Sequence, residues 1–260
     1  MLSIGVFDSG LGGLTVVQEM RKLIKGAKLY YLADTKYAPY GDKTQEEILE
    51  YSLQITHYFI KNYAIDALII ACNTATSAAI STLRERFPEL VIIGAEPGIK
   101  PAIEQSLTKR VGVLATKATL EGVKYQALAE KLSTQHAVSL FEQPCVGLVE
   151  QIEKGEIETA KTEEMLAQWL APMQAASVDT IVLGCTHYPM VASVIERLME
   201  GKVSLVHTGE AISLRLLSLL EAKGHENHGT LEIHVCHTSE INKEMITQLL
   251  GEVEVSLCSY

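Results

Sequence analysis

Short apolar runs alternate along this chain with longer segments in which apolar residues recur every three or four positions. Short runs rich in valine, isoleucine and leucine predict strands covered on both faces, and the longer amphipathic segments predict helices. The expected strands are Ser3–Phe7, Lys28–Leu32, Ala67–Ala71, Val91–Gly94, Arg110–Ala115, Val138–Phe141, Thr180–Gly184, Ser204–His207 and Leu231–Cys236. Expected helices lie between these strands, and examples are Leu14–Ile24, Thr44–Asn62, Ala75–Arg86, Thr119–Lys131, Glu163–Ala176 and Ala211–Ala222. This alternation predicts an α/β fold with mainly parallel sheets.

A weak internal repeat divides the pattern into two halves. The run Ile-Gly-Val-Phe-Asp-Ser at residues 4–9 resembles Val-Gly-Val-Leu-Ala-Thr at residues 111–116. At nearly the same offset, Leu-Ile-Ile-Ala-Cys-Asn-Thr at 68–74 resembles Ile-Val-Leu-Gly-Cys-Thr-His at 181–187. Two matches at similar offsets predict two similar α/β lobes, although strands of similar composition can also match by coincidence.

The breaks in the pattern give the expected lobe boundaries. Glu96-Pro97-Gly98 and the stretch around Thr208-Gly209 are the best candidate hinges. We therefore expect one lobe from residues 1–96 plus 209–260 and a second lobe from residues 97–208. Each lobe is expected to be a mainly parallel sheet flanked by helices, with the active site in the cleft between them.

Charge and composition exclude several classes of protein. The chain of 260 residues has a formal net charge of −10, which disfavours nucleic acid and anionic membranes as partners. A small anionic substrate stays compatible, because its binding depends on local donors. The longest apolar run, Ala67 to Cys72, is too short for a membrane span, and the start of the chain does not read as a signal peptide. A cytoplasmic enzyme is the expectation.

The five cysteines, at positions 72, 145, 185, 236 and 258, are widely spaced, and none forms a C-x-x-C pair. This spacing does not favour a structural zinc site or a thioredoxin-like motif, and we expect free thiols and no metal.

Four expected strands end in polar or reactive residues. Ligands of parallel α/β sheets bind outside the carboxyl ends of the strands, so these ends are the candidate site. They carry Asp8-Ser9, Cys72-Asn73-Thr74, Thr116 and Cys185-Thr186-His187. If the two lobes face each other, Cys72 and Cys185 approach one ligand from opposite sides.

Each of these two cysteines also precedes an expected helix start, where a thiolate is favoured. Most cysteines after apolar strands are small buried hydrophobic residues, but a matched pair with polar neighbours favours chemistry. Two opposed thiols suit the inversion of a stereocentre: one thiolate removes the Cα proton, and the other thiol returns a proton to the opposite face. His187 can influence Cys185, and Asp8 can contact a substrate ammonium group or orient Cys72. The turn Gly10-Leu11-Gly12-Gly13 is either a tight βα turn or an anion site lined by amides.

Five segments together resemble the glutamate racemases of the aspartate/glutamate racemase family. They are Gly5-Val6-Phe7-Asp8-Ser9-Gly10-Leu11-Gly12-Gly13, Ala38-Pro39-Tyr40-Gly41, Ala71-Cys72-Asn73-Thr74-Ala75, Leu114-Ala115-Thr116-Lys117-Ala118-Thr119 and Leu183-Gly184-Cys185-Thr186-His187-Tyr188-Pro189. Their order and spacing cover almost the full chain.

The resemblance implies a two-lobed enzyme without cofactor that interconverts L- and D-glutamate and supplies D-glutamate for peptidoglycan. It implies that Cys72 deprotonates D-glutamate, that Cys185 deprotonates L-glutamate, and that Asp8, His187 and Glu150 assist, with Glu150 in the segment that matches least closely. It places the substrate contacts at Asp8, Ser9, Tyr40, Gly41, Asn73, Thr74, Thr116, Thr119, Thr186 and His187. It also implies a homodimer. Some members carry an N-terminal extension and need a peptidoglycan precursor as activator; this chain starts at the first expected strand, so we expect no such need.

Three alternatives stay open at this point. Aspartate racemisation is the nearest, because that enzyme also has two lobes and two cysteines. A binding module would close on an amino acid without chemistry, and a cysteine hydrolase would use Cys185 and His187 but leave Cys72 without a task.

Overall fold

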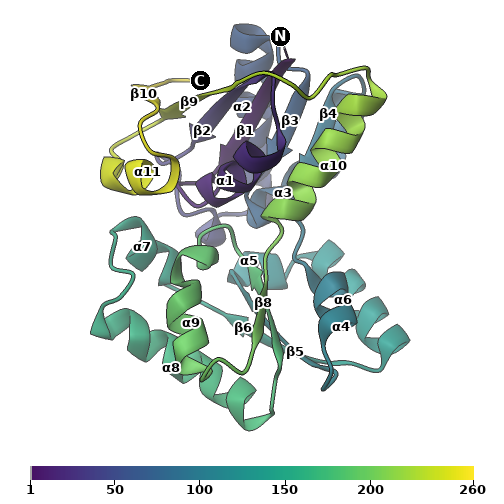
Figure 1. Cartoon of the computed structure of the whole chain (residues 1–260), viewed down its shortest axis with the longest axis vertical. Coiled ribbons are helices and arrows are strands. Elements are labelled where there is room, and N and C mark those ends of the chain that lie inside the picture. The colour runs from purple at the N-terminus through teal and green to yellow at the C-terminus, as the bar shows by residue number, and fades with distance from the viewer. Residues whose placement is uncertain (1) are drawn as a thin grey trace. The chain divides into compact units, whose positions relative to one another are not determined.

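The computed structural model describes residues 2–260, and strands and helices alternate along nearly all of this length. The chain folds into two compact units (Figure 1). Unit 1 comprises the residues up to Ala95 together with Thr208–Tyr260, and unit 2 comprises Glu96–His207.

Unit 1 contains a six-stranded parallel sheet in the order β10-β9-β2-β1-β3-β4. Its strands are β1 (Leu2–Asp8), β2 (Ala27–Ala33), β3 (Ala67–Ile70), β4 (Val91–Gly94), β9 (Leu231–His237) and β10 (Glu254–Leu257). Its helices are α1 (Leu14–Leu23), the 3₁₀ turn η1 (Tyr40–Asp42), α2 (Gln45–Tyr63), α3 (Asn73–Arg86), α10 (Gly209–Ala222) and α11 (Lys243–Leu250). Helix α1 packs with α10 and α11, and α2 packs with α3, so helices cover both faces of the sheet (Figure 1).

Unit 2 contains a four-stranded parallel sheet in the order β6-β5-β7-β8. Its strands are β5 (Arg110–Ala115), β6 (Ser139–Pro144), β7 (Thr180–Gly184) and β8 (Ser204–Val206). Its helices are α4 (Ile99–Gln105), α5 (Lys117–Leu120), α6 (Val123–His136), α7 (Leu148–Glu153), α8 (Ala160–Ala175), the 3₁₀ turn η2 (Tyr188–Val191) and α9 (Ala192–Leu198). Helix α4 packs with α6, and α8 packs with α9.

The two sheets repeat one strand order. In unit 1, β1 lies between β2 and β3, with β4 beyond β3; in unit 2, β5 lies between β6 and β7, with β8 beyond β7. The sequence repeat pairs the same elements, β1 with β5 and β3 with β7. The fold class of mainly parallel sheets flanked by helices is confirmed.

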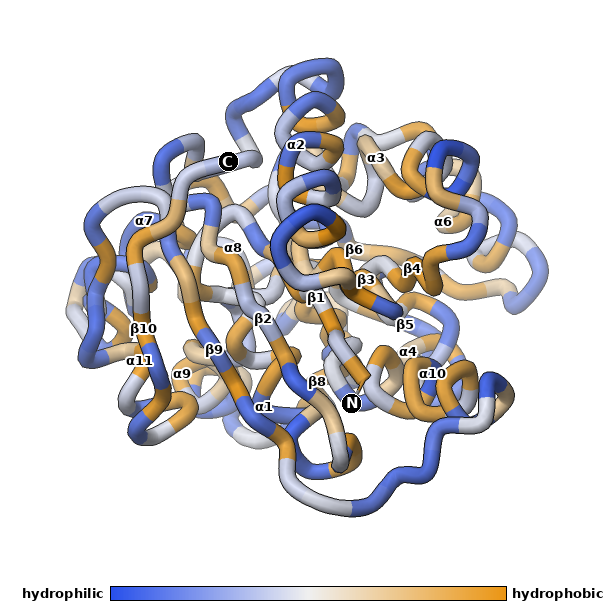
Figure 2. The backbone as a smooth tube through the Cα atoms, turned by 90° about the horizontal axis from the view of Figure 1, so that it is seen from above, coloured by the Kyte–Doolittle hydropathy of each residue, from blue (hydrophilic) through white to orange (hydrophobic). Residues whose placement is uncertain are grey.

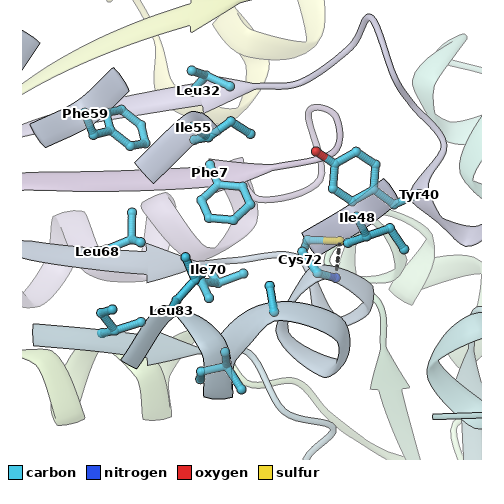
Figure 3. Close-up of a cluster of buried hydrophobic side chains, with 14 of the residues drawn as sticks. Phe7, Leu32, Tyr40, Ile48, Ile55, Phe59, Leu68, Ile70, Cys72 and Leu83 are labelled. Carbon is cyan, nitrogen blue, oxygen red and sulfur yellow. Dashed lines mark hydrogen bonds between the residues drawn. The ribbon is translucent and has the colours of Figure 1, made fainter. Parts of the chain in front are cut away.

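Buried apolar side chains explain why the sequence adopts these strands. In unit 1, Phe7, Leu68 and Ile70 of the sheet share one buried cluster with Ile55 and Phe59 of α2 and with Leu83 of α3 (Figure 3). In unit 2 the corresponding core gathers side chains of β5 and β7 with those of α4 and α6, among them Val111, Val113, Val182, Ile99, Ile103 and Leu132. Removal of this apolar area from water is the main favourable contribution to the folding free energy of both units.

The structure departs from the expected elements at a few places. The predicted helix Thr119–Lys131 is two helices, because the chain turns at Glu121-Gly122 between α5 and α6. Strand β10 was not predicted, since Glu254–Leu257 is a largely exposed edge strand without a continuous apolar run. The polar loop between α10 and β9, residues 223–230, is the long blue stretch in Figure 2. Within residues 2–260, no helix has the length and apolar character needed to cross a membrane.

Candidate active site

The reactive residues of unit 1 lie at the carboxyl ends of its central strands. Asp8 is the last residue of β1, and Cys72 follows β3 by two residues. The register aligns Phe7 of β1 with Ile70 of β3. Asp8 and Cys72, which follow these two residues, therefore lie at the same edge of the sheet.

Cys72 occupies the N-cap of α3, and its sulfur makes the capping contact itself. The Ala75 amide donates to Cys72 Sγ at 3.4 Å, and the Cys72 thiol donates to Ser9 Oγ at 3.8 Å. Only 5% of Cys72 is exposed. A backbone N–H at the positive end of a 14-residue helix favours negative charge on this sulfur, as a base needs.

Asp8 is fully buried beneath the glycine-rich turn. The Gly13 amide donates to Asp8 Oδ2 at 2.7 Å, and the Tyr31 hydroxyl donates to the Gly10 carbonyl at 2.6 Å. A Cβ at Gly13 would lie 2.8 Å from both Asp8 Cβ and Tyr31 Oη, so the turn needs glycine there. The turn therefore directs one amide onto Asp8 and holds that carboxylate at the strand end.

Three further predicted contacts of unit 1 are buried beside Cys72. Asn73 and Thr74 start α3, and the Asn73 side-chain amide donates to the Ala95 carbonyl at 3.2 Å. Tyr40, 1% exposed, belongs to the same apolar cluster as Cys72 (Figure 3). Gly41 follows it within η1 and is partly exposed.

In unit 2, Cys185 directly follows β7 and is 8% exposed. Its sulfur lies 3.7 Å from His187 Nδ1, and His187 Nε2 lies 2.5 Å from Glu153 Oε1. Burial alone would lower the pKa of His187, but its hydrogen bonds to Cys185 and Glu153, with the charges of both, raise it well above the usual value. The geometry defines a thiol–imidazole–carboxylate chain.

Glu150, the assisting carboxylate that the resemblance implies, lies on the same helix as the carboxylate that contacts His187. Glu150 and Glu153 both lie on α7, one turn apart, and the structure pairs His187 with Glu153. Glu150 is half-buried and lies near enough to raise the pKa of Tyr188, after the larger effects of burial and of two cysteines. Positions three apart share a face of a helix, and the sequence analysis did not single out Glu153. Even if a carboxylate partner for His187 had been expected, choosing it would have required knowing which side of α7 faces His187.

The remaining predicted residues of unit 2 form a hydroxyl cluster and a buried turn. Thr116 follows β5 and caps α5: its Oγ1 accepts from the Thr119 amide at 3.2 Å and donates to Thr119 Oγ1 at 2.9 Å. Thr186 is 6% exposed between Cys185 and His187.

The other three cysteines lie outside these arrangements. Cys145 follows β6, and burial raises the pKa of its thiol. Cys236 is on β9 and Cys258 follows β10 in the other unit. All five cysteines are free thiols, and within residues 2–260 no group of three or more His, Cys, Asp or Glu side chains is placed to hold a metal ion.

Comparison with known proteins places this chain in a family. The model of the Asp/Glu/Hydantoin racemase family matches residues 4–213, and the chain belongs to that family. Among its relatives, the glutamate racemase of Sulfurovum sp. (strain NBC37-1) is 60% identical over 97% of this chain and 96% of its own length. The glutamate racemase isoform RacE1 of Bacillus anthracis superposes with a TM-score of 0.88 at 28% identity, covering 99% of this chain and 97% of that one. The Escherichia coli glutamate racemase, solved with L-glutamate and the activator UDP-MurNAc-ala, gives 0.84 at 28% identity, covering 98% and 97%. The resemblance seen in the sequence is thereby confirmed.

Proposed function

We propose that this chain interconverts L- and D-glutamate and does so with Cys72 and Cys185 as opposed acid and base. The full-length identity of 60% to a glutamate racemase supports the reaction. The observation that carries the mechanism is the presence of one buried thiol at the end of β3 and one at the end of β7, the corresponding strands of the two sheets.

In this mechanism Cys72, as the thiolate, removes the Cα proton of D-glutamate, and Cys185, as the thiol, gives its proton to the opposite face. The C–H bond breaks on one side as a new C–H bond forms on the other, and the product is L-glutamate. The two groups exchange roles in the reverse reaction. General acid and base groups work best with pKa values near the working pH, and a free thiol starts at about 8.5.

Each thiol has its own support. The Ala75 amide and the start of α3 stabilise negative charge on Cys72. Asp8, held by the Gly13 amide, contacts the substrate ammonium group or orients Cys72. His187, kept protonated by Glu153, stabilises negative charge on Cys185. We retain Glu150 as an assisting residue that acts through the surroundings of Tyr188.

We propose that polar groups at the strand ends, and in the turns and helices that follow them, bind the substrate. We assign it to Asp8, Ser9, Tyr40, Gly41, Asn73, Thr74, Thr116, Thr119, Thr186 and His187. Their hydroxyls and amides supply donors for the two carboxylates and for the carbanion that develops at Cα. We keep two lobes, residues 1–96 with 209–260 and residues 97–208, as part of this proposal. We also propose a cytoplasmic homodimer that needs no cofactor and provides D-glutamate for peptidoglycan.

Racemisation in heavy water tests this reaction. The inverted product is expected to carry solvent deuterium at Cα, since a thiol exchanges its proton with water. L-glutamate and L-aspartate are supplied separately, and turnover is followed by circular dichroism. Binding of glutamate without exchange would overturn the racemase mechanism, and turnover of aspartate alone would overturn the choice of substrate.

A further inference from the structure

One fully buried carboxylate in unit 1 has no place in the mechanism above. Asp34 is the residue after β2, and none of its surface is exposed. Its backbone amide donates to the Asp8 carbonyl at 2.9 Å, which places it beside the end of β1. A buried carboxylate is costly unless hydrogen bonds offset the loss of hydration, so its partners indicate what it does.

The first partner is Tyr40. Its hydroxyl donates to Asp34 Oδ2 at 2.5 Å, while its ring packs in the apolar cluster that contains Ile48 and Cys72 (Figure 3). Burial, followed by the negative charge and hydrogen bond of Asp34, raises the pKa of Tyr40 well above its usual value. Tyr40 therefore stays a phenol that donates to Asp34, and this bond fixes the rotation of its ring beside the Cys72 sulfur.

The second partner comes from the far end of the chain. Thr238 follows β9, its backbone amide donates to the Ala33 carbonyl at 3.2 Å, and its hydroxyl donates to Asp34 Oδ1 at 3.2 Å. Each carboxylate oxygen of Asp34 thus accepts one side-chain hydroxyl. One hydroxyl belongs to the loop of Tyr40 and Gly41, and the other to the segment that follows the sheet strand β9.

The C-terminal residue reaches the same place. Tyr260 is partly buried, and, after burial, the charge of Asp34 is the largest cause that raises its pKa. The side chain of Tyr260 therefore lies near Asp34, as do the hydroxyls of Tyr40 and Thr238.

We propose that Asp34 is a positioning residue for glutamate binding, which holds Tyr40 and Gly41 in their binding conformation through the Tyr40 hydroxyl and is itself held by Thr238. This role rests on the proposed function, since Tyr40 and Gly41 are substrate contacts only if the chain binds glutamate. In this role Asp34 contacts Tyr40 and Thr238 rather than the substrate or a thiol, and it acts through Tyr40.

A double-mutant cycle tests the coupling. Asp34→Asn leaves one acceptor oxygen for two hydroxyls, so either Tyr40 or Thr238 loses its bond. Tyr40→Phe removes the same bond from the other end. We expect each single variant to raise KM for glutamate about tenfold and to change kcat less than about threefold. In the double variant KM should be no higher than in the worse single variant, because both changes break one interaction.

Two controls separate positioning from loss of structure. Asp179→Asn removes another carboxylate that accepts several hydrogen bonds, from Ser106, Leu107 and Thr108 of unit 2. It is expected to lower Tm and leave KM unchanged. Should Asp34→Asn fail to fold, Thr238→Val weakens the same carboxylate from its other side and is expected to raise KM about threefold.

The outcomes are distinct. Additive effects on KM in the cycle, or a fall in kcat at unchanged KM, would overturn the positioning role. An unchanged KM for glutamate in Thr238→Val would overturn the part of the proposal in which Thr238 holds Asp34. If the wild-type chain racemises glutamate and the Asp34 variant keeps its KM, only the positioning role fails; if the wild-type chain incorporates no deuterium at Cα, the proposed function itself fails.

Discussion

The two units repeat one strand order but support their thiols in different ways. In unit 1, Cys72 caps a long helix, and a backbone amide contacts its sulfur. In unit 2, the turn after Cys185 leads into the short 3₁₀ helix η2, and the sulfur contacts His187 instead. The backbone amides at a helix start do not titrate in the working pH range. The support that an imidazole gives to a thiolate depends on the protonation of that imidazole, and here also on Glu153. In the proposed mechanism the two thiols should therefore respond differently to pH and to mutation.

The largest expected effect comes from removing either thiol. Cys72→Ala and Cys185→Ala should each lower the racemisation rate by about 10³-fold or more, since each removes one of the two proton carriers. The remaining thiol can still exchange one enantiomer. Cys72→Ala is expected to introduce solvent deuterium into L-glutamate only, and Cys185→Ala into D-glutamate only, as measured by NMR of the Cα proton.

The serine variants refine the same comparison. Cys72→Ser and Cys185→Ser should slow the chemical step unequally in the two directions, while the equilibrium constant keeps its value. Full racemisation by either alanine variant, or exchange of both enantiomers by one of them, would contradict the assignment of one face to each thiol.

A smaller effect is expected at the carboxylate that holds His187. Glu153→Gln removes the charge that helps to raise the pKa of His187, so the imidazolium loses its proton at lower pH. We expect kcat/KM to fall about 10- to 100-fold, and the alkaline limb of its pH profile to move to lower pH. Glu150→Gln, one turn earlier on α7, is the matched control and should change the rate less.

Glu153→Gln should also lower stability in a way that depends on pH. A raised folded-state pKa contributes stability that is fully present below the unfolded-state value of about 6.5 and is lost as pH rises through the folded-state pKa. The difference in Tm between wild type and variant should therefore be greatest on the acidic side of that window. A larger loss of activity in Glu150→Gln than in Glu153→Gln would instead favour Glu150 as the main assisting carboxylate.

Much of the fold could be predicted from the sequence. Apolar periodicity located all nine expected strands, because buried parallel strands are continuous runs of β-branched and aliphatic residues. It missed β10, whose burial is one-sided and slight, and it merged α5 and α6 across Gly122. The positions of Asp8, Cys72, Cys185 and His187 could be predicted because each lies at the end of a strand or within three residues of it, so the sheet sets its place.

Residues on helices and in distant loops were less predictable. The contact of Glu153 with His187 depends on how α7 packs, which the sequence pattern does not show. The contact of Tyr40 with Asp34 depends on a loop, and that of Thr238 on a strand about 200 residues later in the chain. Such contacts arise only when the tertiary fold is complete.

The glycine-rich turn of unit 1 offers a further test, because the corresponding segment of unit 2 begins at Thr116 and caps a helix. Gly13→Ala places a Cβ 2.8 Å from Asp8 Cβ and Tyr31 Oη, so Asp8 must move. We expect a loss of about 1–3 kcal/mol in unfolding free energy and a fall in kcat. Gly201→Ala, which has positive φ but nothing within 4 Å of the added carbon, should lose stability without losing kcat. Equal activity in the two variants would show that Asp8 tolerates displacement.

The smallest expected effect separates the two hydroxyls that follow the first strand of each unit. Thr116 caps α5, so Thr116→Ala should lower the unfolding free energy by about 1 kcal/mol, measured by urea denaturation. Ser9 Oγ accepts from the Cys72 thiol and caps no helix, so Ser9→Ala should alter the rate of D-glutamate deprotonation several-fold at nearly unchanged stability. The two substitutions remove the same kind of group from corresponding strand ends, so a stability loss at Ser9 with no kinetic effect would mean that the first hydroxyl serves folding in both units. The expected split instead reflects the partner of each hydroxyl: Thr116 Oγ1 accepts from a backbone amide at the start of α5, whereas helix α1 of unit 1 begins after Gly13 without a side-chain cap and Ser9 contacts the Cys72 thiol.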